Sequence, residues 1–222
     1  MNQITLRFLI TSTVFAGVLG ASVLAAEAGP ELKAEDSLVR LAAGNKRFVA
    51  GTVSHPDQSA VRRTEVAGGQ HPYAIVLACA DSRLSPELIF DEGLGDLFVV
   101  RNAGNLLDDH VIASLEYAVE HLHVPLIVVL GHTKCGAVTA AVAGGTLPGH
   151  LPSIAESLAP AVAMAKKKPG DPVENAVRIS ARFSAAALST MEPIIGEAVK
   201  EGRIKVVAAR YDIATGQVEF LE

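Results

Sequence analysis

Two short apolar runs, at residues 73–78 and 124–130, constrain the fold of this chain more than any other feature. Their sequences, YAIVLA and VPLIVVL, are continuously apolar rather than alternating with polar residues. Runs of this length and kind are typical of parallel strands that are covered by helices on both faces. The sequence therefore predicts an α/β fold in which these two runs are neighbouring buried strands.

A short group of reactive side chains follows each apolar run. Cys79, Asp81 and Arg83 come after the first run, and His132 and Cys135 come after the second. In an open α/β sheet the ligand crevice lies outside the carboxyl ends of the strands, so neighbouring strands would bring Cys79 and His132 together. Thiolates and imidazole are typical zinc ligands, and a catalytic zinc site keeps one position open. Three protein ligands with an Asp-Arg pair beside them fit that description.

Paired cysteines have a simpler use in an exported protein, because they can form a disulfide. A disulfide would not require His132, Asp81 and Arg83 beside it. Each of these three has an ordinary structural use, as a core imidazole, a helix cap and a surface cation. Their occurrence together at two strand ends favours the metal site. Small residues from Gly136 onward also predict a helix there, whose N-terminal dipole would favour a thiolate.

Three motifs carry a resemblance to a known family. They are Cys79-x-Asp81-x-Arg83, Gly131-His132-x-x-Cys135-Gly136 and the segment VVRNAGN at residues 99–105. With these motifs the chain, from about residue 34 to its end, resembles a β-class carbonic anhydrase. The resemblance implies zinc-dependent reversible hydration of carbon dioxide to bicarbonate and a proton by zinc-bound hydroxide, with one Zn²⁺ per subunit.

The resemblance also implies roles for individual residues. The implied zinc ligands are Cys79, His132 and Cys135, the implied catalytic dyad is Asp81 and Arg83, and the implied carbon dioxide pocket includes Gln70, Phe98 and Tyr117. The pocket residues are selected only by their offsets from the metal ligands, and Phe98 and Tyr117 are equally typical of an ordinary core. A free carboxylate is itself a zinc ligand. We therefore expect a bidentate Arg83 clamp to hold Asp81 just outside the coordination shell.

The N-terminus predicts a signal peptide over residues 1–26. Arg7 precedes an apolar stretch at 8–24, and small residues follow, with cleavage near Ala26 or Ala28. Residues 27–222 would then form a single catalytic domain in the periplasm or outside the cell, with no stable membrane span after processing. An uncleaved anchor is the alternative.

The rest of the chain predicts a mainly parallel central sheet with an antiparallel edge strand, flanked by helices. We expect helices over residues 36–50 and 109–122, and helical segments over 174–200 broken near Pro193. The remaining strands are expected at residues 96–100 and 203–209, with an edge strand within 212–220.

Net charge and the family resemblance limit which classes of binding partner are expected. The net charge is -5, which argues against a nucleic-acid surface. The expected partners are the small substrates carbon dioxide and bicarbonate and a second copy of the chain, in a homodimer or homotetramer, because the family builds its active site at a dimer interface.

Two other function classes stay open on the sequence. One is a non-catalytic zinc- or bicarbonate-binding module, and the other is a disulfide-closed α/β domain without metal. The Asp81–Arg83 pair favours the enzyme, because a binding module has less need of a clamp that keeps a zinc position free. Carbonyl sulfide is a possible alternative substrate within the enzyme class.

Overall fold

A computed structural model describes residues 32–221 of the chain. The predicted signal peptide at residues 1–26 lies outside the described residues. Among the described helices, none is both long enough and apolar enough to cross a membrane.

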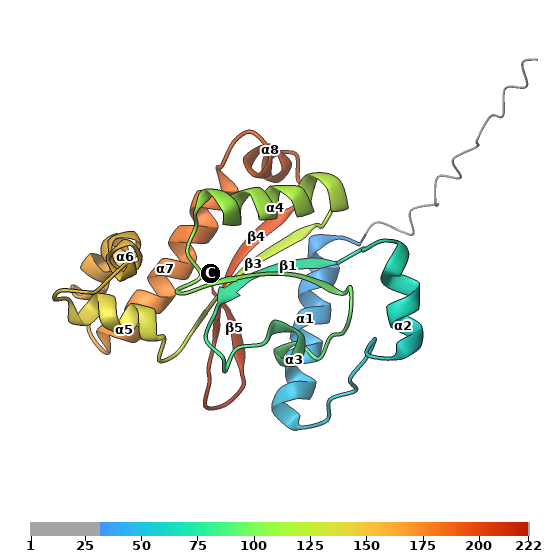
Figure 1. The fold of residues 1–222 in the computed structure, drawn as a ribbon, viewed down its shortest axis with the longest axis horizontal. Coiled ribbons are helices and arrows are strands. Elements are labelled where there is room, and N and C mark those ends of the chain that lie inside the picture. Colours follow the sequence, from blue (N-terminus) through green and yellow to red (C-terminus); the bar gives the residue numbers. More distant parts are fainter. Residues whose placement is uncertain (1–31, 222) are drawn as a thin grey trace, which may run out of the picture. The chain divides into compact units, whose positions relative to one another are not determined.

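A five-stranded sheet forms the centre of the described fold (Figure 1). Its first four strands run parallel, and the last pairs antiparallel at the edge, with Ala208 opposite Leu221. In spatial order the strands are β2 (Leu97–Asn102), β1 (Ala74–Cys79), β3 (Leu126–His132), β4 (Lys205–Tyr211) and β5 (Val218–Leu221). The predicted mainly parallel sheet with an antiparallel edge strand is confirmed.

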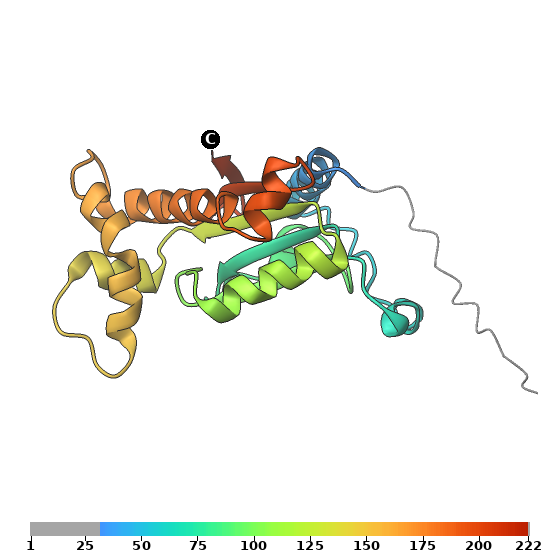
Figure 2. The same cartoon turned by 90° about the horizontal axis from the view of Figure 1, so that it is seen from above.

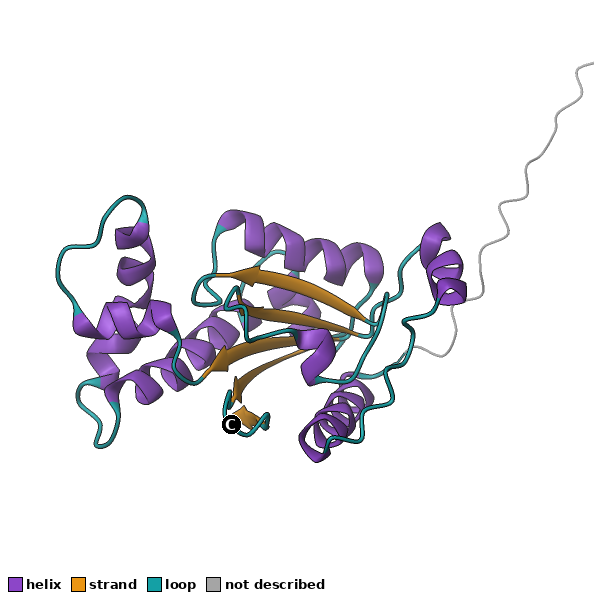
Figure 3. Cartoon of the chain, turned by 60° about the horizontal axis from the view of Figure 1, so that its bottom comes forward, coloured by secondary structure: helices purple, strands orange, loops and turns teal. Residues whose placement is uncertain are grey.

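The continuous apolar runs correspond to the two most buried strands. In β1, Ile75 and Leu77 pack into the apolar cluster that includes helix α4 (Asp109–Leu122). Val76 and Ala78 point to the opposite face and share a cluster with Leu41 of helix α1 (Ala34–Ala50). Figure 3 shows these two helices on opposite faces of the sheet. Because both faces of β1 are covered, its sequence has no polar alternation.

The predicted helices are present, and the break expected near Pro193 falls between two of them. The other helices are α2 (Ala60–Glu65), α3 (Pro86–Ile89), α5 (Gly136–Ala143), α6 (Leu151–Ala165), α7 (Pro172–Ser189) and α8 (Ile195–Lys200), with a 3₁₀ turn at Val66–Gly68. Helix α6 was not predicted; it carries Pro160 in its interior, a position where proline is disfavoured.

The sheet order places the predicted reactive groups together at the carboxyl-terminal ends of neighbouring strands. Strands β1 and β3 are adjacent and parallel, with Ala78 opposite Leu130, so Cys79 and His132 end neighbouring strands. Figure 2 shows α5 and α6 beyond the arrowheads of these strands, at the same end. Gly131 allows helix α7 to pack closely here, because a Cβ at that position would lie 3.0 Å from Val177 Cγ1.

Candidate metal centre

The structure brings the three predicted ligands together. The ligand atoms of Cys79, His132 and Cys135 all lie within 4.8 Å of one another, and all three residues are buried. The two sulfur atoms are 4.0 Å apart, and neither cysteine forms a disulfide. Two sulfur atoms and one imidazole at this spacing match the ligand set of a catalytic zinc site, which leaves one position open.

The imidazole of His132 is oriented for metal binding by the backbone carbonyl of the next residue, Thr133. Its Nδ1 lies 2.9 Å from the carbonyl oxygen of Thr133, so a proton on Nδ1 is donated to that oxygen. Nε2 then carries a lone pair, and this buried atom has no hydrogen-bond partner. A buried polar atom without a partner is costly. A metal ion would satisfy it, and the donor set therefore fits zinc.

The two thiols have opposite environments. The hydrogen bond with Cys135 lowers the pKa of Cys79, and the backbone N–H of Gly104, 3.3 Å from the Cys79 sulfur, lowers it further. That same bond, together with burial, raises the pKa of Cys135. Cys135 caps the N-terminus of α5, as the small residues after it predicted.

Asp81 and Arg83 form the expected clamp outside the ligand cluster. The Arg83 side chain donates from Nε to Oδ1 of Asp81 at 2.9 Å and from Nη2 to Oδ2 at 2.7 Å. The Arg83 backbone N–H adds a third hydrogen bond to Oδ1 at 3.0 Å. The Arg83 side-chain hydrogen bonds hold the pKa of Asp81 well below its usual value. Asp81 is therefore an ionised hydrogen-bond acceptor at neutral pH.

The segment that carries the cluster is braced from strand β2. Arg101 donates from Nε to the carbonyl oxygen of Cys79 at 3.0 Å and from Nη2 to that of Asp81 at 2.8 Å. Gly104, at φ +83, adopts a conformation that favours glycine and aims its N–H at the Cys79 sulfur. Both residues belong to the motif at 99–105, but the sequence alone does not predict these contacts.

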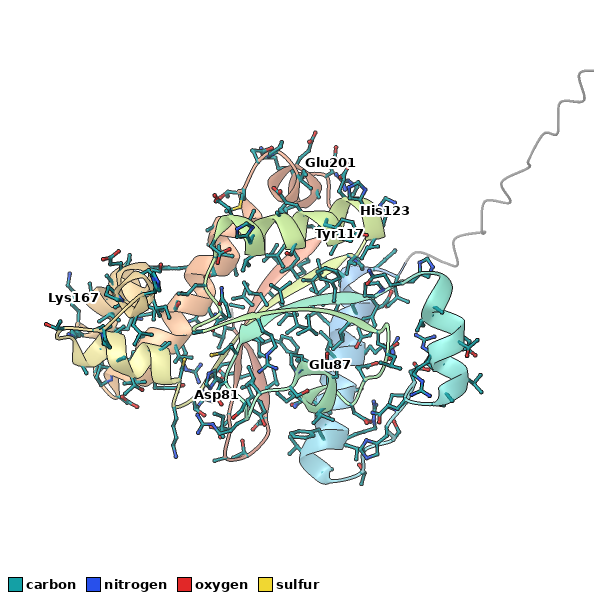
Figure 4. All side chains as sticks on the ribbon, viewed as in Figure 1. Asp81, Glu87, Tyr117, His123, Lys167 and Glu201 are labelled. Atoms are coloured by element: carbon teal, nitrogen blue, oxygen red, sulfur yellow. The ribbon has the colours of Figure 1, made fainter. Side chains whose placement is uncertain are left out.

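The three predicted carbon dioxide contacts lie apart from the cluster in the described chain. Phe98 is opposite Ile75, four residues before Cys79, which is about 13 Å along the strand. Tyr117 is on α4, its ring centroid 6.3 Å from that of Phe98, and Figure 4 places it on the far side of the sheet from Asp81. Gln70 is exposed after the 3₁₀ turn. One chain therefore does not assemble the predicted pocket.

A small apolar cavity at Gly136, the residue that follows Cys135 in the chain, was not predicted. Its volume is about 250 Å³, and nothing lies within 4 Å of where a Cβ on Gly136 would stand. Small and aliphatic residues line it, namely Ala103, Gly136, Ala137, Ala140, Leu147, Leu151, Ile154 and Ala155. Much of this lining comes from α6, the helix that the sequence did not predict.

Known proteins share both the sequence and the fold. A family model described as carbonic anhydrase matches residues 74–218. Carbonic anhydrase 2 of Mycobacterium tuberculosis is 44% identical over 178 residues, covering 78% of this chain and 86% of its own length. A carbonic anhydrase of Mycolicibacterium smegmatis is 41% identical, with 79% of this chain and 87% of its own covered.

Solved structures agree with the sequence comparisons. A tetrameric β-carbonic anhydrase of Sordaria macrospora matches with a TM-score of 0.64 at 30% identity, covering 72% of this chain and 85% of its own. The β-carbonic anhydrase of Coccomyxa, solved with acetazolamide, matches with a TM-score of 0.66 at 26% identity, covering 84% of this chain and 82% of its own.

Proposed function

The chain belongs to the β-carbonic anhydrase family, and on that premise we propose that it catalyses the zinc-dependent reversible hydration of carbon dioxide to bicarbonate and a proton. One observation carries the proposal. A buried Cys79–His132–Cys135 cluster with an unpartnered Nε2 lies next to a carboxylate, Asp81, that is held by an arginine instead of joining the cluster.

The cofactor is zinc, which Cys79, His132 and Cys135 would hold. When bound, zinc would lower the pKa of a coordinated water and so supply a nucleophile for carbon dioxide. The protein surroundings make the cysteines suitable ligands, because Gly104 N–H donates to the Cys79 sulfur and α5 begins directly after Cys135.

Asp81 and Arg83 act as a unit in this proposal. The ionised Asp81 carboxylate accepts a hydrogen bond from the attacking group and orients its lone pair toward the substrate carbon. Arg83 keeps the carboxylate in place through two side-chain hydrogen bonds, so that it does not take the fourth metal position. The apolar cavity beside Gly136 suits carbon dioxide, which has no net dipole or charge.

We propose that the active unit is a homodimer or homotetramer. Gln70, Phe98 and Tyr117 lie apart from the metal ligands within one chain, so a second copy would have to bring them to the site. Tyr117 is 46% exposed, which leaves its ring available to a partner. The Sordaria macrospora relatives are described as tetrameric.

The proposed location is the periplasm or the cell exterior. It rests on the sequence of residues 1–26 and the small residues at Ala26 and Ala28. Mass spectrometry of the protein purified from a membrane-free extracellular or periplasmic fraction tests it. A mature N-terminus near residue 27 supports export, and an intact Met1 in the cytoplasmic fraction contradicts it.

Stopped-flow carbon dioxide hydration by the zinc-loaded protein tests the activity, with Asp81→Ala as the inactive variant. Glu201→Gln, in an exposed ion pair with Arg203, is the matched control and should retain full activity. Zinc bound at one per subunit without turnover would instead indicate a non-catalytic binding module. Absence of zinc together with a Cys79–Cys135 disulfide would indicate an α/β domain without metal.

A further inference from the structure

The sequence motif at residues 99–105 contributes an arginine whose side chain points at the loop that carries Asp81. Arg101 is the penultimate residue of strand β2 and lies opposite Ala78 in the sheet register. Its guanidinium donates to two carbonyl oxygens, those of Cys79 and Asp81, at 3.0 and 2.8 Å. These two backbone oxygens belong to Cys79, a candidate metal ligand, and to Asp81, whose side chain is the candidate catalytic carboxylate.

A guanidinium group is planar and rigid, so two hydrogen bonds from it fix two acceptors relative to each other. Here the acceptors are two residues apart, and the bonds therefore restrain the rotation of the backbone between Cys79 and Asp81. The pairing of strand β1 with β2 continues one step beyond the strand, because Ala80 N–H donates to the Asn102 carbonyl at 2.9 Å. The backbone of this loop is thus held from β2 at three points.

Two arginines hold Asp81 at opposite ends. Arg83 binds its carboxylate, and the same guanidinium reaches the Lys134 carbonyl at 3.3 Å. Arg101 binds its backbone carbonyl. The Arg83 side chain is 49% exposed, so water can compete for its hydrogen bonds, and the Arg101 contact adds a second, independent restraint on Asp81 through the backbone.

The consequence concerns the fourth metal position. A carboxylate two residues from a metal ligand can itself bind zinc. Rotation of the backbone at residues 80–81 is the simplest movement that would bring Asp81 there. We propose that Arg101 is a positioning residue that blocks this movement and keeps Asp81 on Arg83. The proposal rests on the proposed function, because carbon dioxide hydration needs that position free.

Cobalt-substituted protein gives a readout that does not depend on catalysis. Thiocyanate, a small anion that takes an open metal position, is titrated against the visible absorption of bound Co²⁺. The variants are Arg101→Ala, Arg101→Lys, Asp81→Asn and the double variant Asp81→Asn with Arg101→Ala. Arg203→Ala, which removes an exposed arginine from its pair with Glu201, is the matched control.

In Arg101→Ala, Asp81 competes for the metal, so the thiocyanate concentration at half-saturation should rise about tenfold or more, and kcat/KM for carbon dioxide should fall by a similar factor. Arg101→Lys should behave in the same way, because one ammonium cannot reproduce the planar fork. In the double variant the asparagine amide is a poor ligand, so half-saturation should return to the value of Asp81→Asn alone. Arg203→Ala should match the wild type.

The proposal would be overturned if Arg101→Ala and Arg101→Lys both reached half-saturation at the same thiocyanate concentration as the wild type. A rise that persists in the double variant would also overturn it, because Arg101 would then act on the anion directly instead of through Asp81. Arg101→Lys keeps the test valid if Arg101→Ala does not fold. A wild-type protein that hydrates no carbon dioxide but shows the expected cobalt pattern would overturn the proposed function and leave the positioning role of Arg101 intact.

Discussion

The Asp91 carboxylate ties helix α1 to the loop that follows it, and its removal should destabilise the protein in a pH-dependent way. The side chain is 1% exposed and forms an ion pair with Arg47 of α1. It also accepts hydrogen bonds from the Ser54 N–H, the Ser54 hydroxyl and the His55 N–H. Asp91→Asn keeps the volume and removes the charge, so it isolates the contribution of the carboxylate.

The expected loss in the free energy of unfolding follows from how deeply Asp91 and Arg47 are buried. Breaking a buried ion pair by removing one partner costs about 3–5 kcal/mol. The Arg47 side chain is 37% exposed and can be solvated after the change. We therefore expect the lower end of that range, a loss of about 3 kcal/mol in the free energy of unfolding at pH 7.

The pH dependence has a definite sign. Burial raises the pKa of Asp91, but the hydrogen bonds from Ser54, Arg47 and His55 outweigh it and hold the pKa well below its usual value. A carboxyl with a depressed folded-state pKa stabilises the protein fully above its unfolded pKa of about 3.9. The difference between wild type and Asp91→Asn should be constant above about pH 5 and shrink by about 1.4 kcal/mol per pH unit below about pH 4.

Urea unfolding at a single protein concentration, repeated from pH 3 to pH 8, measures this difference. Zinc release in acid affects both proteins alike and cancels. Glu201→Gln, in an exposed pair, is the control and should cost less than about 1 kcal/mol. A wild-type-to-variant difference that stays the same from pH 8 to pH 3 would refute the reasoning, because the charge of Asp91 would then not be its source.

Three further predictions concern the metal site and the anchoring of α1. Arg83→Ala should keep one zinc per subunit by elemental analysis and lose most activity. Cys135→Ser should lose zinc to a chelator faster than the wild type. Equal zinc retention and equal activity in both variants would contradict the assigned roles. After zinc removal, glutathione disulfide should oxidise Cys79 and Cys135 to a disulfide, seen as a loss of two free thiols, and bound zinc should prevent the oxidation. Unchanged thiols in the metal-free protein would contradict the 4.0 Å approach of the two sulfur atoms. Asn45 makes three hydrogen bonds to backbone groups. Asn45→Ala should therefore lower the free energy of unfolding in urea by about 3 kcal/mol, and the near-isosteric Asn45→Asp should lower it at least as much. An Asn45→Asp variant as stable as the wild type would show that packing matters and the hydrogen bonds do not.

The sequence predicted the central strands because burial on both faces leaves an unmistakable apolar run. It also predicted the meeting of Cys79 with His132, since parallel neighbouring strands end at one edge of a sheet. No helix was predicted at α6. Local rules disfavour Pro160 inside a helix, but packing of Leu158 and Val162 in the core overrides that preference.

The candidate substrate pocket was harder to predict than the metal ligands for a physical reason. Metal ligands lie at strand ends whose neighbours follow from topology. The proposed contacts Phe98 and Tyr117 lie together on a partly exposed face, and their distance from the cluster within one chain became visible only in the structure. The offsets from the metal ligands identified these residues, but they did not show whether the same chain or a second copy brings them to the metal site.

The role of Arg101 depends on strand register, which a motif does not encode. Residues along a strand alternate between the two faces, so shifting β2 by one position would turn the Arg101 side chain away from the loop it binds. The observed pairing of Ala78 with Arg101 and Cys79 with Asn102 prevents that. Strand β1 therefore has metal-site partners on both sides. Strand β3 ends at His132 and leads into the turn that carries Cys135. Strand β2 supplies Arg101 and leads to Gly104, whose N–H contacts the Cys79 sulfur. A central strand with two parallel neighbours is the arrangement that makes this possible, because only then do three strand ends converge on one sulfur atom.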